Sequence, residues 1–305
     1  MKKRVFCFCL SLLFLFLSMP LSASAQAGAK DPVKRFLIFG RDQAAALTDT
    51  IFLVSRNEAT GSMSVLQIPR DTYAEYGNGN YRKLNGALRS LGSEKCKAFF
   101  SRALGVKIDW FAAMDLECVS LLVDAVGGVD LDVPMDMDYS DPAQNLEIHL
   151  SKGLQHLNGA AALSFIRFRS GYVNADLGRM DAQKVFLRAF AEKCRDLSAT
   201  TFLRMFMLSI PHMQTDLPIH EAVRISNGLR NCDFSAIPME TAKGEAIRGK
   251  SGAWYYVLSR AGTLNAVNRL LEPPAPVSED AFDPDRVFDR AADADFHRIY
   301  TSSTT

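Results

Sequence analysis

The alternation of apolar runs and helical apolar stripes along the chain predicts an α/β protein. Residues 36–39 form a buried-type strand that ends at Gly40, and residues 50–54 and 64–68 predict two more strands. The segment 57–62, which contains Gly61, has the composition of a hairpin turn between them. The first part of the chain therefore predicts neighbouring strands of one sheet.

Helical spacing then takes over from strand spacing. Apolar residues recur at helical intervals over residues 93–104 and 116–126, and Gly127-Gly128 ends the second stripe. Residues 129–133 alternate as a strand, 159–163 predict a short helical turn, 178–197 a long helix, and 200–271 one or two helices with an apolar patch at 254–257. We expect one compact domain with a mixed sheet.

Residues 164–169 predict a strand with two arginines on one face. Read with a period of two, Arg167 and Arg169 lie opposite Ile166 and Phe168. Asp176 then fits the N-cap of the following helix.

Near the amino end of that helix, Arg179 and Gln183 lie one turn apart. Guanidinium forks, an amide and free helix N–H groups together favour an anion with several oxygens, usually phosphate. The alternative is a solvated edge strand with two exposed arginines.

The N-terminus has the pattern of an export signal. A basic start is followed by an apolar run over residues 5–19 and small residues up to Ala27. Cleavage after Ala25 or Ala27 is favoured over retention as a signal anchor, and either way the rest lies outside the cytoplasm. We assign residues 1–27 to the signal, 28–34 to a linker and 272–305, rich in Pro, Asp and Ser, to a loosely ordered tail.

Cysteine usage leaves the disulfide question open. Cys7 and Cys9 fall in the signal, and the remaining four show no CxxC spacing typical of zinc. Outside the cell these cysteines permit disulfides. We favour the pairing that joins neighbouring elements, with free buried thiols as the alternative: Cys96–Cys118 and Cys194–Cys232.

Composition limits the partners. The 48% apolar content supports a substantial core, and a net charge of +1 provides no basic field of the kind that binds nucleic acid. Anion binding must therefore come from a local cluster.

Several charged blocks follow predicted strands. Asp42 and Asp49 come at neighbouring strand ends, where two carboxylates can share Mg²⁺, although either could instead cap a turn. Pro69 places Arg70 in a loop, and Lys83 and Asn85 form a further cation and amide pair. Without a Ser-His or Cys-His nucleophile, these blocks indicate metal-assisted phosphoryl transfer.

In this order and spacing, the blocks over residues 35–200 resemble the LytR-CpsA-Psr family. The likeness rests on Gly40-Arg41-Asp42, Thr48-Asp49-Thr50, Ile68-Pro69-Arg70-Asp71-Thr72, Lys83-Leu84-Asn85, residues 123–129 and 153–159, Phe165-Ile166-Arg167-Phe168-Arg169 and Asp176-Leu177-Gly178-Arg179.

The resemblance implies an α/β fold, a single catalytic domain over residues 35–271 with a central mixed sheet between helices in three α-β-α layers. It implies a Gram-positive cell-envelope transferase, acting at the outer face of the membrane or in the wall. Such an enzyme moves a teichoic-acid-like or capsular glycopolymer from an undecaprenyl-pyrophosphate carrier to peptidoglycan as a phosphodiester. The implied cofactor is Mg²⁺, with Mn²⁺ as the alternative, and no nucleic acid is expected.

The resemblance also assigns roles. Asp42 and Asp49 serve the metal, and Asp42 is the first candidate for accepting the sugar proton. Asp176 is either a second candidate or only a cap. The residues expected to hold the pyrophosphate are Arg70, Lys83, Asn85, Arg167, Arg169, Arg179 and Gln183. An apolar tunnel for the lipid would draw on Phe99, Phe100, Leu104, Trp110, Phe111, Leu121, Leu122, Phe186 and Phe190.

Three positions depart from the family's usual basic residues: Leu47, Ala74 and Ala182. Their loss leaves two alternatives to the transferase, a non-catalytic polyprenyl-phosphate-binding protein and a hydrolase of lipid-linked pyrophosphate. A transcriptional role is discounted, because the chain carries an export signal and has no helix-turn-helix signature.

Overall fold

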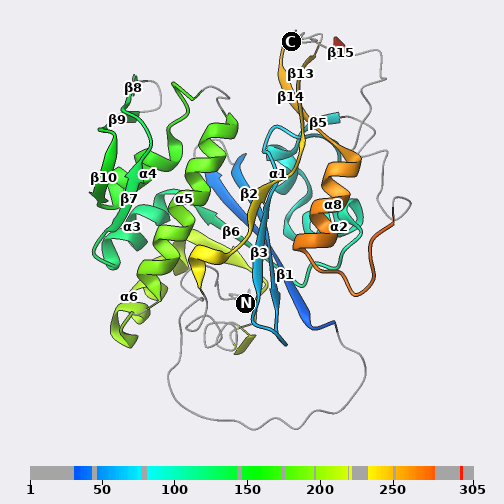
Figure 1. The fold of residues 1–305 in the computed structure, drawn as a ribbon, viewed down its shortest axis with the longest axis horizontal. Helices are drawn as coiled ribbons and strands as arrows, with labels where there is room; N and C mark the ends of the chain where they lie inside the picture. The colour runs from blue at the N-terminus through cyan, green and yellow to red at the C-terminus, as the bar shows by residue number, and fades with distance from the viewer. Residues whose placement is uncertain are drawn as a thin grey trace, which may run out of the picture. The chain divides into compact units, whose positions relative to one another are not determined.

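The computed structural model describes residues 31–42, 47–76, 81–142, 146–172, 176–195, 197–218, 220–221, 233–249, 252–278 and 296–297. These residues fall into two compact units (Figure 1). Unit 1 comprises the described residues within 112–237, and unit 2 those within 31–111 and 238–297. The predicted signal and Cys232 lie outside the described residues.

Unit 2 is organised around a mixed sheet. Strand β1 (Val33–Asp42) pairs antiparallel with β2 (Leu47–Asn57), which pairs antiparallel with β3 (Met63–Gln67). Strand β12 (Met239–Thr241) joins β3 in parallel. The predicted hairpin is confirmed, and its turn contains Gly61 at a φ of 77°. The central sheet is therefore mixed, as expected.

Helices and smaller strands complete unit 2. The helices are η2 (Leu84–Gly86), α1 (Ala87–Leu91), α2 (Ser93–Leu104) and α8 (Arg260–Leu270), of which α8 lies beside β3 (Figure 1). The strands are β4 (Tyr73–Glu75), β5 (Tyr81–Lys83), β13 (Gly244–Gly249), β14 (Trp254–Leu258) and β15 (Phe296–His297).

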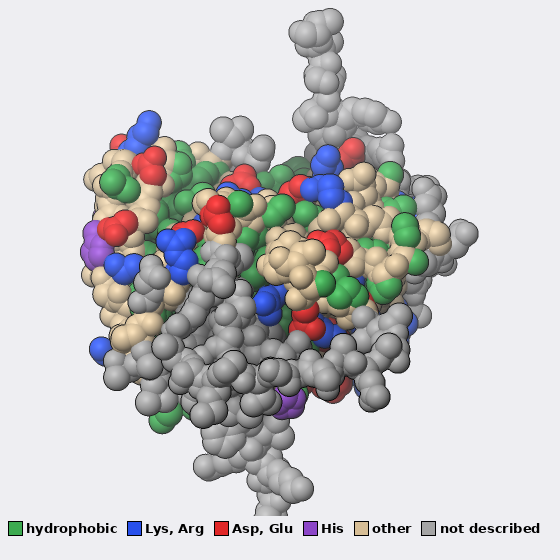
Figure 2. Space-filling view, turned by 60° about the horizontal axis from the view of Figure 1, so that its bottom comes forward, with side chains coloured by type: hydrophobic (Ala, Val, Ile, Leu, Met, Phe, Trp, Pro, Cys, Tyr) green, Lys and Arg blue, Asp and Glu red, His purple; other side chains and the backbone are tan. Residues whose placement is uncertain are grey.

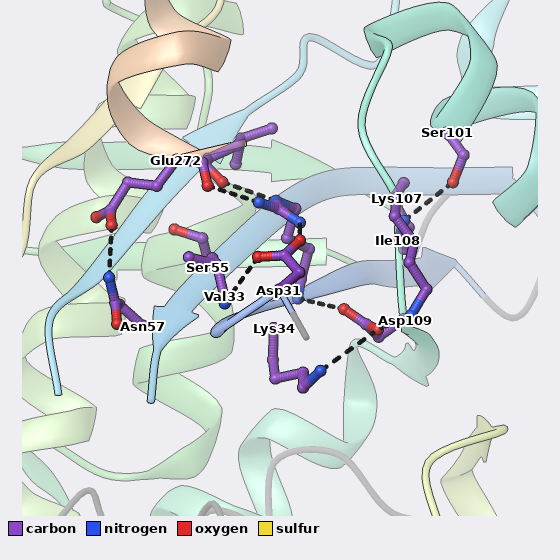
Figure 3. A network of polar contacts seen from close by, with 12 residues as sticks. Asp31, Val33, Lys34, Ser55, Asn57, Ser101, Lys107, Ile108, Asp109 and Glu272 are labelled. Carbon is purple, nitrogen blue, oxygen red and sulfur yellow. Dashed lines mark hydrogen bonds and ion pairs between the residues drawn. The ribbon is translucent and has the colours of Figure 1, made fainter. Parts of the chain in front are cut away.

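A buried arginine fixes the start of β1. The fully buried Arg35 donates to the carbonyl oxygens of Leu271 and Glu272, each at 2.7 Å, and pairs with Asp31 at 2.6 Å. The first carbonyls beyond α8 thus receive a cation, which suits a helix carboxyl end. Figure 3 shows the surrounding contacts, including Asn57 donating to the Glu272 carboxylate.

Folded structure extends beyond both predicted ends of the catalytic domain. β1 begins at Val33, two residues before the predicted boundary at residue 35. Beyond residue 271, Asn268 exchanges two hydrogen bonds with the backbone of Val277. Folded structure therefore extends at least over residues 31–278, with the gaps given above.

Unit 1 contains helices and short two-stranded sheets. The helices are α3 (Glu117–Ala125), α4 (Gly159–Arg167), α5 (Asp176–Cys194), α6 (Ala199–Ser209), η4 (Ile210–His212) and η5 (Phe234–Ala236). The two-stranded sheets pair β7 (Val129–Val133) with β10 (Gly153–Leu157) and β8 (Met137–Asp141) with β9 (Leu146–Leu150). β11 (Met213–Thr215) pairs with β6 (Trp110–Asp115), and both belong to the six-stranded sheet of order β11-β6-β1-β2-β3-β12.

The core of unit 1 lies among α3, α4, α5 and β7. Leu122, Phe165 and Ile148 are fully buried there, and Phe186 stacks on Phe190 with ring centroids 5.7 Å apart. Most of the tunnel candidates are core residues in their own units. Leu121 instead is exposed, and Trp110 is half-buried. A lipid tunnel stays a prediction.

The predicted strand over residues 164–169 is wrong. Residues up to Arg167 belong to α4, Phe168 is extended, and Arg169 lies in neither a helix nor a strand. Asn158 caps the helix by accepting from the Ala161 amide, and the buried Ala162, Phe165 and Ile166 follow helical spacing. A run of six residues is too short to distinguish the strand period from the helix period, and the cap at Asn158 favours the helix.

The disulfide prediction is also wrong. Cys96, Cys118 and Cys194 are buried free thiols, and burial raises the pKa of each to about 12. Each cysteine packs as a small apolar side chain inside its own unit.

Charge is dispersed on the surface. On the face drawn in Figure 2, basic and acidic side chains are interspersed and do not gather by sign. Within the described ranges, no helix has both the length and the hydropathy needed to cross a bilayer.

Candidate functional site

A β-bulge marks the position of Asp49. In the β1–β2 ladder Gly40 pairs with Thr50 and Arg41 with Thr48, so Asp49 is the extra residue of the bulge. Bulges bend a strand and re-aim a side chain, and they are frequent beside active sites. Asp42 ends β1 opposite Leu47, and its side chain lies outside the described residues.

Three segments of unit 2 are joined by hydrogen bonds at this end of β2. The Asn85 amide donates to the Arg70 carbonyl at 2.8 Å, and the Thr48 hydroxyl donates to the Asn85 carbonyl at 3.1 Å. The Leu84 amide donates to the Thr72 carbonyl at 2.8 Å. The structure therefore brings together the blocks that contain Asp49, Arg70, Lys83 and Asn85.

Thr72 closes the turn that carries Arg70. Its amide and its hydroxyl both donate to the Pro69 carbonyl, at 3.1 and 2.6 Å. Pro69 fixes its own φ and lacks an N–H, which suits the point where the strand stops pairing. The rigid turn places Arg70 and Asp71 beside the bulge.

Charge is paired across this cluster. Arg70 Nη1 donates to Asp49 Oδ1 in a close ion pair, and both side chains are largely buried, with 17% and 18% of their surface exposed. Lys83 Nζ lies 3.1 Å from Asp71 Oδ1, and that pair is more exposed. A substrate phosphate would find two cations already oriented by carboxylates.

The Asp49 carboxylate suits one ligand position of a hard cation. It is a partly exposed oxygen donor placed by a bulge, and Mg²⁺ takes one or two carboxylates together with substrate phosphates and waters. Among the residues that the structure describes, no group of three His, Cys, Asp or Glu side chains could hold a metal ion. Asp49 thus fits one ligand of such a metal, and the Mg²⁺ site shared with Asp42 stays a prediction.

The second cluster lies in unit 1, where α4 ends and α5 begins. Arg167 is the last residue of α4 and is half-buried, while Arg169 is exposed. Gln183 Nε2 donates to the Ile166 carbonyl at 3.3 Å, which ties α5 to the last turn of α4. These predicted phosphate ligands therefore share one helix junction.

Asp176 opens α5 and pairs with Arg179 in the first turn. Its Oδ1 lies 2.7 Å from Arg179 Nη2, and Arg179 is buried with 4% of its surface exposed. A carboxylate is favourable in the first turn of a helix, close to the positive end of its dipole. This contact supports an orienting role for Asp176 toward Arg179.

Tyr172 packs over the start of α5 at Gly178. A Cβ added at Gly178 would lie 2.5 Å from Tyr172 Cβ and Cγ, so only glycine permits this approach. Tyr172 also makes an edge contact with Phe168 at 5.5 Å. Burial, with the Asp181 charge as a lesser cause, raises the pKa of Tyr172 to about 12.

The sequence reasoning missed three residues of the first cluster. Thr48 and Asp71 stand within quoted blocks, but only the fold shows that they hold Asn85 and Lys83. Tyr255 comes from β14, and its ring centroid lies 5.9 Å from Lys83 Nζ. The sequence signal that could have pointed to Tyr255 is the aromatic run at residues 254–256. The alternation of that run does not say which residues it contacts.

Fold and clusters define a mixed α/β protein whose arginines, lysine and carboxylates suit an oxygen-rich anion. The LytR_cpsA_psr family matches residues 20–271. The chain belongs to this family, as its motifs predicted.

Curated relatives and solved structures agree. The chain is 29% identical over 245 residues to the polyisoprenyl-teichoic acid--peptidoglycan teichoic acid transferase TagU of Bacillus cereus, covering 79% of this chain and 78% of that one. It is 32% identical over 230 residues to TagV of Bacillus subtilis, covering 74% and 59%. The crystal structure of B. subtilis TagU matches with a TM-score of 0.59 at 26% identity, covering 80% and 96%. TagT bound to LIIa-WTA matches with a TM-score of 0.66 at 21% identity, covering 81% and 94%, which bears on the fold alone.

Proposed function

We propose that this protein transfers a teichoic-acid-like glycopolymer from a polyprenyl-pyrophosphate carrier to peptidoglycan in the cell envelope. The observation that carries the proposal is the cluster in unit 2, where Asp49, Arg70, Asp71 and Lys83 meet at a bulged strand end. The support from relatives is that TagU and TagV are named as transferases of this type.

The reaction follows from the charge that develops on the carrier. A sugar hydroxyl of peptidoglycan attacks the phosphorus that bears the glycopolymer, and a new phosphodiester P–O bond forms. The bond from that phosphorus to the bridging oxygen breaks, and polyprenyl phosphate leaves with the electron pair. Cations that contact the bridging oxygen bind the transition state more tightly than the ground state. Arg70 and Lys83 of unit 2 are assigned this role, and the family motifs predict that Arg167 and Arg169 of unit 1 also bind the pyrophosphate.

The proton of the attacking hydroxyl needs an acceptor, and Asp42 remains our first candidate for it. Its backbone at the end of β1, opposite Leu47 in the same ladder as the Asp49 bulge, supports this assignment. Asp176 is assigned to orienting Arg179, because its carboxylate is already engaged in that ion pair. The base is therefore sought in unit 2.

A divalent metal completes the proposal. Asp42 and Asp49 would hold Mg²⁺, or Mn²⁺ in its place, and the ion would neutralise phosphate oxygens. Asp49 would then serve both the ion and Arg70, whose guanidinium it already contacts.

The location follows the substrate. A polyprenyl carrier keeps the reaction at the outer surface of the membrane, and the N-terminal signal pattern supports export.

The test is reconstitution with the purified protein. A polyprenyl-pyrophosphate-linked saccharide and peptidoglycan oligomers are incubated with and without Mg²⁺, and products are identified by mass spectrometry. We expect a phosphodiester conjugate that requires the metal and is lost in Arg70→Ala. Polyprenyl phosphate together with a free saccharide phosphate, without conjugate, would instead support hydrolysis of the lipid-linked pyrophosphate.

A second candidate, a binding protein without transfer, is favoured by the positions that lack the usual cations. Ala74 is fully buried and Ala182 is 4% exposed, so both positions are filled by core packing. Tight donor binding without conjugate and without cleavage of the donor to polyprenyl phosphate would support this second function.

A further inference from the structure

Lys83 is held between a carboxylate and an aromatic ring. Its Nζ lies 3.1 Å from Asp71 Oδ1 and 5.9 Å from the centroid of the Tyr255 ring. A lysine ammonium on a four-carbon stem has many rotamers, so two fixed neighbours narrow its positions considerably. Lys83 also stands directly opposite Tyr73 in the β4–β5 ladder.

Tyr255 itself is firmly placed within unit 2. Its ring makes an edge contact with Tyr73, with centroids 5.1 Å apart and planes at 75°. A Cβ added at Gly249 would lie 3.1 Å from Tyr255 Cε2, so the ring packs closely against that glycine. β13 holds its backbone, with Ile247 opposite Tyr255.

The strand that carries Tyr255 is joined to the turn that carries Arg70 and Asp71. The Tyr256 amide donates to the Asp71 carbonyl at 2.9 Å, and Thr72 forms a parallel bridge with Tyr256. The backbone segments that carry Tyr255, Asp71 and Lys83 are therefore connected by hydrogen bonds. Arg70 belongs to the same network, because its carbonyl accepts from the Asn85 amide.

From this arrangement we propose that Tyr255 is a positioning residue for Lys83 in binding the substrate diphosphate. The ring holds the Lys83 ammonium beside the turn that carries Arg70. The Asp71 carboxylate pairs with that ammonium until a phosphate oxygen replaces the carboxylate. This inference rests on the assignment of Lys83 to the phosphate in the proposed function. It adds a residue outside the charged motifs, on a strand more than 170 residues further along the chain.

Two opposite effects follow. Replacing Tyr255 by Leu removes the ring and weakens diphosphate binding by about two- to fivefold, the factor that corresponds to one partly exposed cation–π contact. Tyr255→Phe keeps the ring and retains the affinity. Asp71→Asn removes the competing negative charge and tightens binding.

The experiment is calorimetric titration of the full chain with inorganic pyrophosphate, for the wild type and the variants Tyr255→Leu, Tyr255→Phe, Lys83→Met and Tyr255→Leu/Lys83→Met. If Tyr255 acts through Lys83, the Tyr255→Leu loss disappears in the Lys83→Met background. A purely structural role would give the same loss in both backgrounds and overturn the proposal. Unchanged affinity in Tyr255→Leu, or in Lys83→Met, would overturn it as well.

Folding and function are checked separately. Circular dichroism and thermal unfolding verify each variant, and Tyr255→Met serves if Tyr255→Leu does not fold. The titration needs no glycopolymer, so a protein that forms no conjugate but shows the coupled losses would refute the proposed transfer and leave the positioning role established.

Discussion

At the scale of single residues, the cations of the unit 2 cluster are engaged before any substrate arrives. Arg70 contacts Asp49 and Lys83 contacts Asp71. Such pairs orient long side chains in advance, which reduces the ordering that binding would otherwise require. A phosphate must displace the carboxylate from each cation before it can bind. An anion that binds the cation more weakly than the carboxylate does is therefore excluded.

Removing an arginine of the α4–α5 junction should strongly reduce transfer. Arg167→Ala or Arg169→Ala each removes a donor that is predicted to bind the pyrophosphate, and we expect kcat to fall by about 10²–10³, or about 2.7–4 kcal/mol. Steady-state rates of conjugate formation measure this. Arg195→Ala, which removes the arginine just beyond the end of α5 that pairs with Glu192, is the control and should change the rate little. An arginine variant with full turnover would contradict the pyrophosphate assignment.

Asp49→Asn tests the metal assignment. The amide keeps the size of the side chain but loses the charge, so the Mg²⁺ concentration for half-maximal activity should rise by at least about tenfold. The measurement is activity against Mg²⁺ concentration at saturating donor. Asp181→Asn provides a matched control, because its carboxylate is exposed on α5 in unit 1, where it pairs with Lys184. An unchanged Mg²⁺ curve in Asp49→Asn would contradict the role.

At the scale of elements, strands and long helices could be predicted from the sequence, but the functional junction could not. The β2–β3 hairpin, α2, α3 and β7 follow the expected pattern because each has a long stripe or a clear turn. The strand prediction for residues 164–169 fails because Ile166 and Phe168 alternate as in a strand, while Phe165 and Ile166 continue the helical spacing from Ala162. The cap at Asn158 decides the outcome, and it acts from outside that window.

Asn158→Ala should therefore destabilise α4. Its side chain accepts the Ala161 amide at 2.9 Å, and loss of such a cap costs about 1 kcal/mol. Urea unfolding would show a lower midpoint, while Asn158→Ser, which can still cap, stays near the wild type. Equal losses in both variants would show that capping is not the cause.

Gly178→Ala should also destabilise the protein, although alanine normally favours a helix. The added methyl would clash with Tyr172, and overpacking of this kind costs about 1–3 kcal/mol. Urea unfolding measures the change. In a Tyr172→Ala background the clash is gone, and the same substitution should be neutral or stabilising. A penalty of the same size in both backgrounds would exclude the clash.

At the scale of the whole molecule, three thiols link stability to pH. Unfolded thiols titrate near 9, whereas burial raises the pKa of Cys96, Cys118 and Cys194 to about 12. The folded state therefore retains these protons more strongly, and its advantage is complete below pH 9 and declines as the pH rises from 9 toward 12. Urea midpoints at pH 8 and 10 measure the decline.

A variant with alanine at the three positions is the control for this effect. It should be less stable at pH 8 but lose less stability between pH 8 and 10. An identical pH dependence in both proteins would show that other groups dominate. The sequence could give the number of cysteines but not their burial, because burial depends on which elements pack together.

The bulge at Asp49 separates the chemistry of the site from the strand pairing of the sheet. Because Asp49 is the extra residue in the ladder, the flanking Thr48 and Thr50 keep their own cross-strand neighbours whichever side chain stands between them. Substitutions at this point therefore cost the ladder little, whereas deleting the residue would remove the bulge and the carboxylate that it places. We expect laboratory exchanges of Asp49 to reduce activity while the sheet stays folded.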